Sequence, residues 1–439
     1  MVNKMTPTLA RSTPFIQSLK VGRANALPGE PLWLTDLRKS DALFMDACEL
    51  PQFGVEEWKH TSLASLWSQS ARIADAFNWV VSDELKALSV KGARTIFIVN
   101  GQPVKDGSWL SAEDLPGVAF LSGTQAWEEL DAGKRNFNAV SRNDSGLFLR
   151  LNRLGFKEPL VITVEPDTVV GGLLHIVNLV TVPDAALFPR IFIRLGRGAE
   201  LNVLQSYVSW SGGGYVNVPV TDVILEAGAR LEYAESHEQS LLASYIGAVR
   251  VWQGRDSSFR SMVATSGAGL FRSNISVMLE GEGAGARING LHRLNGEAHA
   301  DSHTLLEHLA LNTTSDQMYK CVLEDSAHSV FNGRVFVHRE AQKTSSYQLN
   351  KNLLLSRDCR VDTKPQLEIK ADDVKCTHGA TISQLNDEQL FYLQTRGIGR
   401  EASRLMLVQG FMDDVLSRVA HPLIRQFLTR ALVPGENRA

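Results

Sequence analysis

The stretch VDTKPQLEIKADDVKCTHGATISQLNDEQLFYLQTRG, residues 361–397, combines an alternating β pattern, the pair Cys376-x-His378 and the start of a helical segment. Because successive side chains of a strand point to opposite faces, a strand over Val374–His378 places Cys376 and His378 on the same face. A thiolate and an imidazole on one face are ligands for a soft metal or an iron–sulfur fragment. The alternative is a buried core thiol beside a hydrogen-bonded histidine, since free cysteine is among the most buried residue types.

Upstream of this stretch the sequence is rich in short β segments, and a weak repeat recurs at the turns between them. The segments are Leu160–Val164, Leu174–Val182, Arg190–Leu195, Val216–Leu225, Ala248–Trp252 and Ile275–Leu279. The repeat is a small or polar residue, any residue and an apolar one, at Ala199–Leu201, Ala229–Leu231, Ser257–Phe259, Ala286–Ile288, His328–Val330 and Cys359–Val361. Its intervals of 30, 28, 29, 42 and 31 residues are typical of a β-solenoid whose coils stack strand on strand. An ordinary β-sandwich with turn signals at chance spacing is the alternative.

The N-terminal part of the chain is predicted to be mainly helical. Apolar residues recur at roughly helical spacing over residues 30–90. Thr95–Val99 followed by Asn100-Gly101 predicts a strand that ends in a type I′ hairpin turn. A further helix is predicted over Thr124–Ala132, with Gly133 as its stop. We place the end of this α/β unit near residue 150.

The C-terminal part is predicted to be helical as well. Asn386 fits a helix N-cap with Gln389 at N3, and Gly397 is a suitable C-terminal stop. An apolar stripe at helical spacing follows: Leu405, Val408, Phe411, Met412, Val415, Leu416 and Val419. Pro422 interrupts the pattern before a last helix over Leu423–Leu432. We expect the stripe to cap the open end of the solenoid and its outer face to dock a partner.

Composition describes an ordinary soluble protein of two or three domains. The chain has 439 residues, of which 44% are hydrophobic and 21% charged. A net charge of −3 gives no electrostatic footprint for nucleic acid. The longest uncharged stretch, Leu201–Thr221, carries too many polar groups to span a bilayer. We therefore expect neither a nucleic-acid partner nor a membrane.

The cysteines and the N-terminal segment favour a cytoplasmic location of the protein. The four cysteines, Cys48, Cys321, Cys359 and Cys376, form no C-x-x-C pair and no disulfide framework, which indicates reduced thiols. The first 29 residues carry only basic charges but no apolar region of the kind used for secretion. A plastid stromal location is the alternative that this basic segment leaves open.

No catalytic motif is present. The sequence contains no P-loop and no G-x-S-x-G elbow, and Gly281–Gly285 falls short of a dinucleotide fingerprint. Four histidines lie close together in the sequence: His292, His299, His303 and His308. On a helix, His299 and His303 would share a face, and their i, i+4 spacing would suit zinc. In a β context, residues four apart lie too far from one another to chelate one ion, so we expect no metal there, and we expect His308 to be structural.

One enzyme hypothesis remains. Parallel β-helices often carry polysaccharide lyases or hydrolases, whose paired carboxylates could here come from Asp358, Asp362, Asp372 and Asp373. Acidic residues beside strand ends are also common turn formers. A purely structural adaptor without metal chemistry is the other alternative.

The segments VDTKPQLEI, DDVKCTHGAT and DEQLFYLQTRGI, in this order, resemble the C-terminal signature of the SufB/SufD family, which are scaffold subunits for iron–sulfur cluster assembly. The resemblance is to the SufD branch, because SufB has a different pattern where this chain has Cys376-Thr377-His378-Gly379. Near the N-terminus, residues 57–63 (EWKHTSL) resemble the family's W-K-x-T motif. Within the family, a right-handed parallel β-helix is the expected core.

The resemblance also implies a role. It implies an α/β domain at 1–150, a β-helix core at 151–380 and a helical domain at 381–439. A SufB partner would pair through the β-helix, and a SufC ATPase would dock on the helical domain around residues 386–432. ATP binding by SufC would bias the pair between closed and open arrangements.

By the same resemblance, the nascent cluster is expected at the SufB–SufD interface, and the chain itself is expected not to be an enzyme. Carried over by motif, Cys376 and His378 are the candidate metal ligands, with His378 the stronger. SufB would supply the remaining ligands of a transient shared cluster. No tightly bound cofactor is expected in the isolated chain, which could pair with itself, and the sequence shows no flavin motif.

Overall fold

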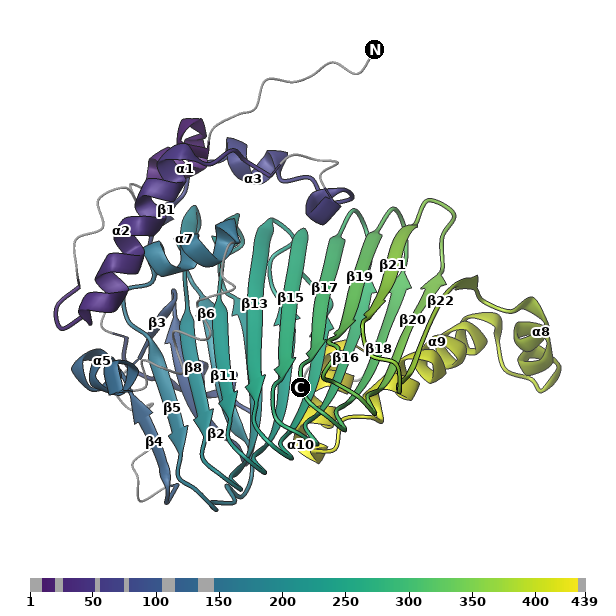
Figure 1. The fold of residues 1–439 in the computed structure, drawn as a ribbon. Coiled ribbons are helices and arrows are strands. Elements are labelled where there is room, and N and C mark those ends of the chain that lie inside the picture. Colours follow the sequence, from purple (N-terminus) through teal and green to yellow (C-terminus); the bar gives the residue numbers. More distant parts are fainter. Residues whose placement is uncertain are drawn as a thin grey trace, which may run out of the picture.

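The computed structural model describes residues 10–19, 27–51, 56–74, 79–104, 115–132 and 146–432. Most of them form a solenoid of long strands, with helices packed over its N-terminal end and along one side (Figure 1). The prediction of a mainly β chain with a parallel β-helix core and helical segments towards both ends is confirmed.

Successive strands alternate between two sheets, which we call sheet A and sheet B. Along its length, sheet A contains β4 (Val118–Leu121), β5 (Leu160–Val164), β8 (Arg190–Leu195), β11 (Val220–Leu225), β13 (Ala243–Gln253), β15 (Leu270–Leu279), β17 (His299–His308), β19 (His328–Val337) and β21 (Arg360–Ile369), with the short strands β1 (Arg72–Ile73), β7 (Ala185–Leu187) and β10 (Tyr215–Asn217) beside its early members. Sheet B contains β3 (Gln102–Pro103), β2 (Arg94–Val99), β6 (Leu174–Val180), β9 (Glu200–Ser209), β12 (Arg230–Glu238), β14 (Ser258–Thr265), β16 (Gly285–Leu294), β18 (Thr314–Leu323), β20 (Ser345–Leu354) and β22 (Lys375–Gln384). The pairs β4–β5 and β2–β3 are antiparallel, and the strands that follow pair in parallel.

The sequence repeat is real, but its predicted register was wrong after the third coil. Four residues of sheet B lie side by side on neighbouring strands: Leu201, Leu231, Phe259 and Ala286. The repeat therefore continues at Ala286, two residues before the predicted Ile288. The triplets that end at Val330 and Val361 belong to sheet A, where Val361 pairs with Ser329 instead. The interval of 42 residues marks the change of sheet, which the sequence conceals because both sheets repeat with nearly the same period.

The N-terminal helices lie over the solenoid, and most of them cover sheet A, whereas the short helix over Asp83–Lys86 packs against β2 and β6 of sheet B. They are η1 (Ala10–Ser12), α1 (Pro14–Leu19), α2 (Leu32–Ala47), η2 (Glu56–Trp58), α3 (Ala64–Ser68), α4 (Asp83–Lys86), α5 (Gly123–Ala132) and α7 (Leu147–Gly155). Aromatic residues such as Phe15, Trp67 and Phe148 share one core with Phe192 of β8. Asp41 of α2, which is buried, is held by Arg153 of α7 at 2.6 Å, so its charge is paired.

The predictions for this region had different outcomes. Residues 30–90 were predicted to be helical, and their described part contains the helices α2, η2, α3 and α4, although the short strand β1 lies among them. The strand and type I′ turn are confirmed: β2 ends at Val99, and Asn100 and Gly101 have φ of 50° and 82° before β3 pairs back. The helix α5 is also as predicted, while its predicted stop at Gly133 lies outside the described residues.

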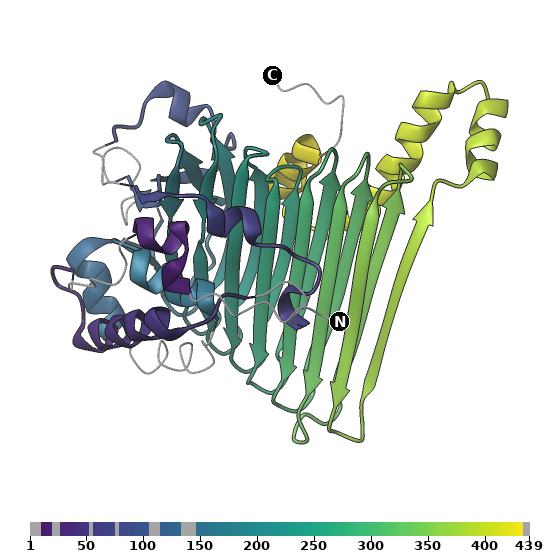
Figure 2. The same cartoon turned by 90° about the horizontal axis from the view of Figure 1, so that it is seen from above.

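Residues 56–68, which we call the strap, run across the outer face of sheet A towards its later strands (Figure 2). Thr61 donates a hydrogen bond to Asp301 of β17 at 2.6 Å. Arg272 of β15 donates to the backbone oxygen of Glu57 at 2.7 Å. The strap thus links the N-terminal helices to the far half of the solenoid.

The C-terminal helices are α8 (Asp387–Thr395), α9 (Arg400–Leu416) and α10 (Pro422–Leu432). The Asn386 side chain accepts hydrogen bonds from the N–H groups of Glu388 and Gln389, and Gly397 has φ of 83°, which confirms both predicted ends of α8. Pro422 begins α10, a position where its missing N–H costs nothing.

The prediction that the apolar stripe of α9 caps the open end of the solenoid was wrong. Its buried residues, Val408, Met412 and Val415 among them, pack sideways on the outer face of sheet B. That face carries a diagonal row of apolar residues: Leu204, Ala234, Met262, Leu291, Val322 and Leu353. Burying the stripe against this row removes both apolar surfaces from water. The described C-terminal helices therefore do not cover the end of the solenoid.

Candidate functional site

The last coil, formed by β21 and β22, is the open end of the solenoid. Each of its strands pairs on one side only, β21 with β19 and β22 with β20. Among the described residues, no strand pairs with the outer edge of either. The same end lies away from the N-terminal helices, with α8 projecting beyond it (Figure 2). Unpaired edges of this length invite another chain to add a strand.

Cys376 and His378 point into the interior of the solenoid at this open end. They are in register with Ser346 and Gln348 of β20, whose side chains are buried in the preceding coil. Cys376 packs against the end of the core and is half-buried, whereas His378 is exposed. The structure therefore brings the two predicted ligands together on one inward face, with no further coil to cover them.

The two side chains supply suitable donors but too few of them for a complete site. Burial raises the pKa of the Cys376 thiol, opposed by its hydrogen bond with the Ser346 backbone, so the thiol stays protonated until a cation displaces the proton. No described group of three or more His, Cys, Asp or Glu residues is placed to hold a metal ion. Further ligands would have to come from another chain.

The backbone of β22 offers a pairing edge at the same residues. The N–H of Lys375 donates to the backbone oxygen of Thr344, the residue before β20, at 2.9 Å. Because backbone groups alternate between the two sides of a parallel strand, the N–H and C=O groups of Cys376, His378 and Ala380 point to the open side.

The neighbouring edge of β21 is partly blocked. The N–H of Arg360 donates to the backbone oxygen of Ala327 in the preceding coil. The backbone N–H and C=O groups of the odd-numbered residues of β21 therefore point to the unpaired edge. One of them is Pro365, which has no N–H to offer. The edge of β22 is thus the better template for an added strand.

The other cysteines lie apart from Cys376. Cys359 precedes β21 and lies 3.4 Å from the backbone oxygen of Asp325. Since β22 runs back along the coil, Cys359 is near its far end, on the order of 25 Å from Cys376. Burial raises the pKa of the Cys321 thiol to about 12. Cys48 lies at the end of α2 in the N-terminal region.

The four histidines of residues 292–308 do not converge. His292 and His308 are buried inside the solenoid, where burial lowers the pKa of each to about 4. His308 contacts Thr313 and Ser315 at 2.8 and 2.9 Å, a structural role as expected. His299 and His303 lie on the opposite, outer face of β17, where His303 meets Asp301 at 3.0 Å.

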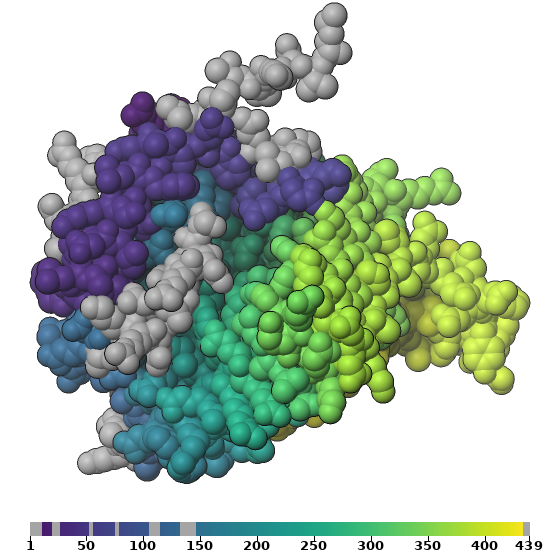
Figure 3. All heavy atoms as spheres, viewed as in Figure 1, coloured from purple at the N-terminus to yellow at the C-terminus, as the bar shows by residue number. Residues whose placement is uncertain are grey.

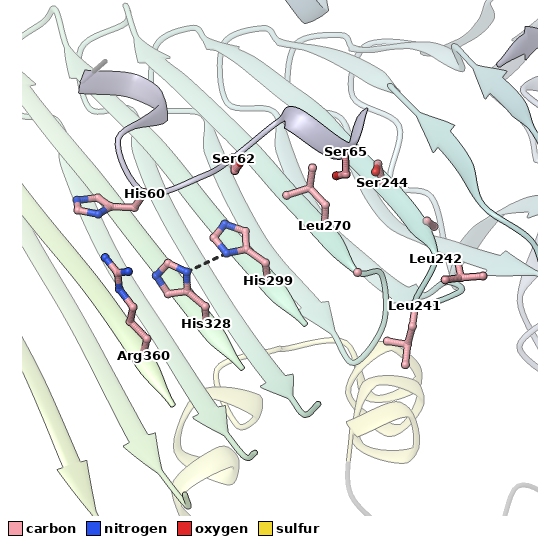
Figure 4. Close-up of a pocket in the computed structure, with 12 residues that line it drawn as sticks. His60, Ser62, Ser65, Leu241, Leu242, Ser244, Leu270, His299, His328 and Arg360 are labelled. Carbon is pink, nitrogen blue, oxygen red and sulfur yellow. Dashed lines mark hydrogen bonds between the residues drawn. The ribbon is translucent and has the colours of Figure 1, made fainter. Parts of the chain in front are cut away.

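On the outer face of sheet A, the structure forms a network that the sequence analysis missed. His299 and His328 face each other across β17 and β19, beneath the strap, in a pocket of about 530 Å³ (Figure 4). His328 contacts Asp362 of β21 at 2.8 Å, and Asp362 lies 3.3 Å from His60 of the strap. His299 and His328 are paired residues of the neighbouring strands β17 and β19. Their spacing of about one coil in the sequence is the signal that could have predicted this contact.

The carboxylates considered for a lyase do not gather. Asp362 is bound to His328 and Arg360 within the network. Asp372 and Asp373 lie exposed in the turn before β22, where the Asp373 N–H donates to the Gln342 side chain at 2.9 Å. Asp372 and Asp373 are therefore turn residues, as the alternative interpretation supposed, whereas Asp362 lies within β21.

The C-terminal helices present a second exposed surface. None of the residues of α8 is buried, and Phe391 and Tyr392 are 68% and 57% exposed. Leu405 and Met406 of α9 are also half-exposed. The space-filling view shows these helices standing out from the solenoid at its C-terminal side (Figure 3). Within the described part of the chain, no helix has the length and apolar character needed to cross a membrane.

Comparisons with known proteins agree on one family. The family model described as "SUF system FeS cluster assembly, SufBD core domain" matches residues 178–411. The chain is 30% identical to the iron–sulfur cluster assembly protein SufD of Escherichia coli, over 86% of this chain and 87% of that protein. It is 27% identical to a SufBD family protein of Synechocystis, over 88% and 87%, and 34% identical to the chloroplastic protein ABCI7 of Arabidopsis thaliana, over 72% and 68%. The resemblance carried by residues 361–397 is confirmed.

Proposed function

The chain belongs to the SufBD family of iron–sulfur cluster assembly proteins, and from that premise we propose that it is a non-enzymatic scaffold subunit. It pairs with a SufB-like partner through the last coil, and a transient cluster forms between the two chains. One observation carries this proposal. At Cys376 and His378, side chains that can bind a metal point into the solenoid, and the backbone N–H and C=O groups of the same residues lie unpaired at the open edge of β22.

The division of labour follows from the number of ligands. An iron–sulfur cluster is usually held by four protein ligands, and this chain offers two at the open end. The partner therefore supplies the rest, and the cluster leaves when the pairing loosens. In this proposal the core at residues 151–380 provides the interface, and the helical domain at 381–439 receives the ATPase. The N-terminal domain at residues 1–150 covers the opposite end, and its strap reaches across sheet A to the last coil.

Ala380→Pro tests the pairing edge. Proline removes an outward N–H and places its ring towards the partner, while the bonds of β22 to β20 remain and Gly379 accommodates the restriction before proline. We expect association with the SufB-like partner to weaken about tenfold or more, with little change in stability. Affinity is measured by titrating the purified partner, and stability by urea unfolding.

Thr381→Pro is the matched control, since it breaks a bond inside the chain's own sheet. It should lower the free energy of unfolding by about 1–3 kcal/mol. Equal partner affinity for the parent chain and Ala380→Pro would contradict pairing through β22. If the parent chain binds only a second copy of itself through this edge, the SufB-like partner is excluded and the family role must be revised.

The exposed surface of α8 is the proposed dock for a SufC-like ATPase. Phe391 and Tyr392 project from a helix with no buried residue, and aromatic anchors of this kind dominate binding energy. We expect Phe391→Asp or Tyr392→Asp to weaken ATPase binding by roughly 30-fold each, from a loss of about 2 kcal/mol. Tyr347→Asp, at an exposed aromatic residue of β20, is the control and should bind as the parent chain does.

A further inference from the structure

We propose that His299 and His328 form a divalent metal site on the outer face of sheet A, of the imidazole-binding class that includes Zn²⁺ and Co²⁺. This site is separate from the cluster site at Cys376 and His378, and it does not depend on the proposed function. The Nδ1 atoms of the two imidazoles lie 3.0 Å apart, and the hydrogen-bond partners of each ring determine which of its nitrogens carries the proton.

The hydrogen bonds of Thr61 place the proton of His299 on Nε2. Thr61 has one hydroxyl hydrogen, which it donates to the Asp301 carboxylate at 2.6 Å. The Arg272 guanidinium donates to the same Asp301 oxygen at 2.9 Å, so this carboxylate is paired with a cation and acts as the acceptor. The Thr61 oxygen, 2.9 Å from Nε2 of His299, must therefore accept from that nitrogen. His299 carries its proton on Nε2, and its Nδ1 has a free lone pair.

The contact with Asp362 places the proton of His328 on Nε2 as well. Its Nε2 lies 2.8 Å from an oxygen of Asp362. The Arg360 guanidinium donates to the same Asp362 oxygen at 2.9 Å, so this carboxylate is paired with a cation and acts as the acceptor. His328 therefore also carries its proton on Nε2. The two Nδ1 lone pairs then face each other.

Two facing lone pairs at this distance repel unless a cation lies between them. A shared proton is one such cation and a metal ion is the other, and the metal titration described below distinguishes them. A tetrahedral zinc ion with bonds of about 2.05 Å separates two nitrogen ligands by about 3.3 Å. The observed separation is within a few tenths of an ångström of that value, so little movement is required.

The surroundings match those of a metal-bound imidazole pair. Metal ligands of this kind commonly donate their second N–H to a carboxylate or another oxygen, as His328 does to Asp362 and His299 to Thr61. Both rings line the pocket of about 530 Å³, which leaves room for water as the remaining ligands (Figure 4). Because Thr61 belongs to the strap and Asp362 to the last coil, an ion here would fasten the strap to the open end.

The test is metal titration of the tag-free, full-length chain. We expect one equivalent of Co²⁺ to give the visible bands of tetrahedral nitrogen and oxygen ligation, without the near-ultraviolet thiolate band that binding at Cys376 would add. Zn²⁺ should displace it. His299→Gln and His328→Gln should abolish these bands, and Asp362→Asn should weaken binding about 10- to 100-fold.

His338→Gln is the matched control, because His338, the residue after β19, pairs with Glu307 and no other histidine of the described residues faces it. It should bind Co²⁺ as the parent chain does. Equal Co²⁺ spectra for the parent chain and both glutamine variants would overturn the proposal. Should a variant fail to fold, histidine-selective ¹⁵N resonances of the parent chain decide. Two Nδ1 signals that move with Zn²⁺ support the site, and a shared proton that ignores Zn²⁺ overturns it.

Discussion

A chain carrying both Cys376→Ala and His378→Ala is expected to bind its partners normally and to build no iron–sulfur cluster. The two substitutions remove the inward donors of the last coil, and their backbone groups remain available for pairing. Because His378 is exposed and Cys376 only half-buried, the fold should lose little stability, roughly 1 kcal/mol or less. Ultraviolet–visible absorption after anaerobic reconstitution of the complex with SufB-like and SufC-like proteins measures the outcome.

The control for this experiment lies on the same strand. Lys375→Ala with Thr377→Ala alters two exposed residues whose side chains point away from the interior, so cluster assembly should match the parent complex. A third variant, Cys359→Ala, asks whether the distant thiol substitutes for Cys376, and we expect full assembly. Parental cluster levels in the Cys376/His378 double variant would assign the cluster to the partner alone and leave this chain as an adaptor.

The second large effect is a steep loss of stability in weak acid. Burial lowers the pKa of three interior or packed histidines, to about 3 for His175 and to about 4 for His292 and His308. In the unfolded chain each takes up a proton near pH 6.5, whereas in the folded chain it stays neutral. The unfolded state therefore binds more protons below pH 6.5, and the stability present above this pH is lost as the pH falls towards 4.

The size of this effect follows from linkage. Each such histidine contributes at most about 1.4 kcal/mol per pH unit, so three contribute about 4 kcal/mol per pH unit. The free energy of unfolding of a native domain is only about 5–15 kcal/mol. The groups near His292 are His237, which opposes its protonation, and Asp301, which favours it, and the net shift is still downward. We expect cooperative unfolding to begin near pH 5.

Urea unfolding at several pH values between about 7 and 5 measures the slope. His175→Gln should reduce that slope by about 1.4 kcal/mol per pH unit. Ser206→Ala is the matched control, because it removes the hydroxyl 2.8 Å from Nε2 of His175 and keeps the titrating ring. It should lower stability at all pH values and leave the slope as it was. A slope unaffected by His175→Gln would show that this histidine is not buried in its neutral form.

Much of the fold was predictable because it depends on local chemistry. Strand bounds such as Leu160–Val164 and Arg190–Leu195 were predicted to the residue, since apolar runs between turn residues define them. The Asn100-Gly101 turn and the Asn386 cap depend on residues next to one another in sequence. The shared face of Cys376 and His378 likewise follows from the two-residue period of any strand.

The remaining features were decided by the tertiary structure, because they depend on which distant segments meet. The sequence gives a period near 30 but not the sheet to which each repeat belongs, so two of the six predicted repeats lay in the other sheet. The stripe of α9 required an apolar surface, and only the folded molecule shows that sheet B offers one and the open end does not.

The candidate sites divide in the same way. Cys376 and His378 are neighbours in sequence, so the pattern could point to them. The network at His299 joins Thr61, separated by 238 residues, to His328 in the next coil and Asp362 beyond it. Nothing in the local sequence marks such residues, because their chemistry arises only where the strap crosses the stacked coils. The sequence by itself therefore determined the strands, the turns and the inward pair, whereas stacking and packing decided which edge stays open and which side chains share a proton or a metal.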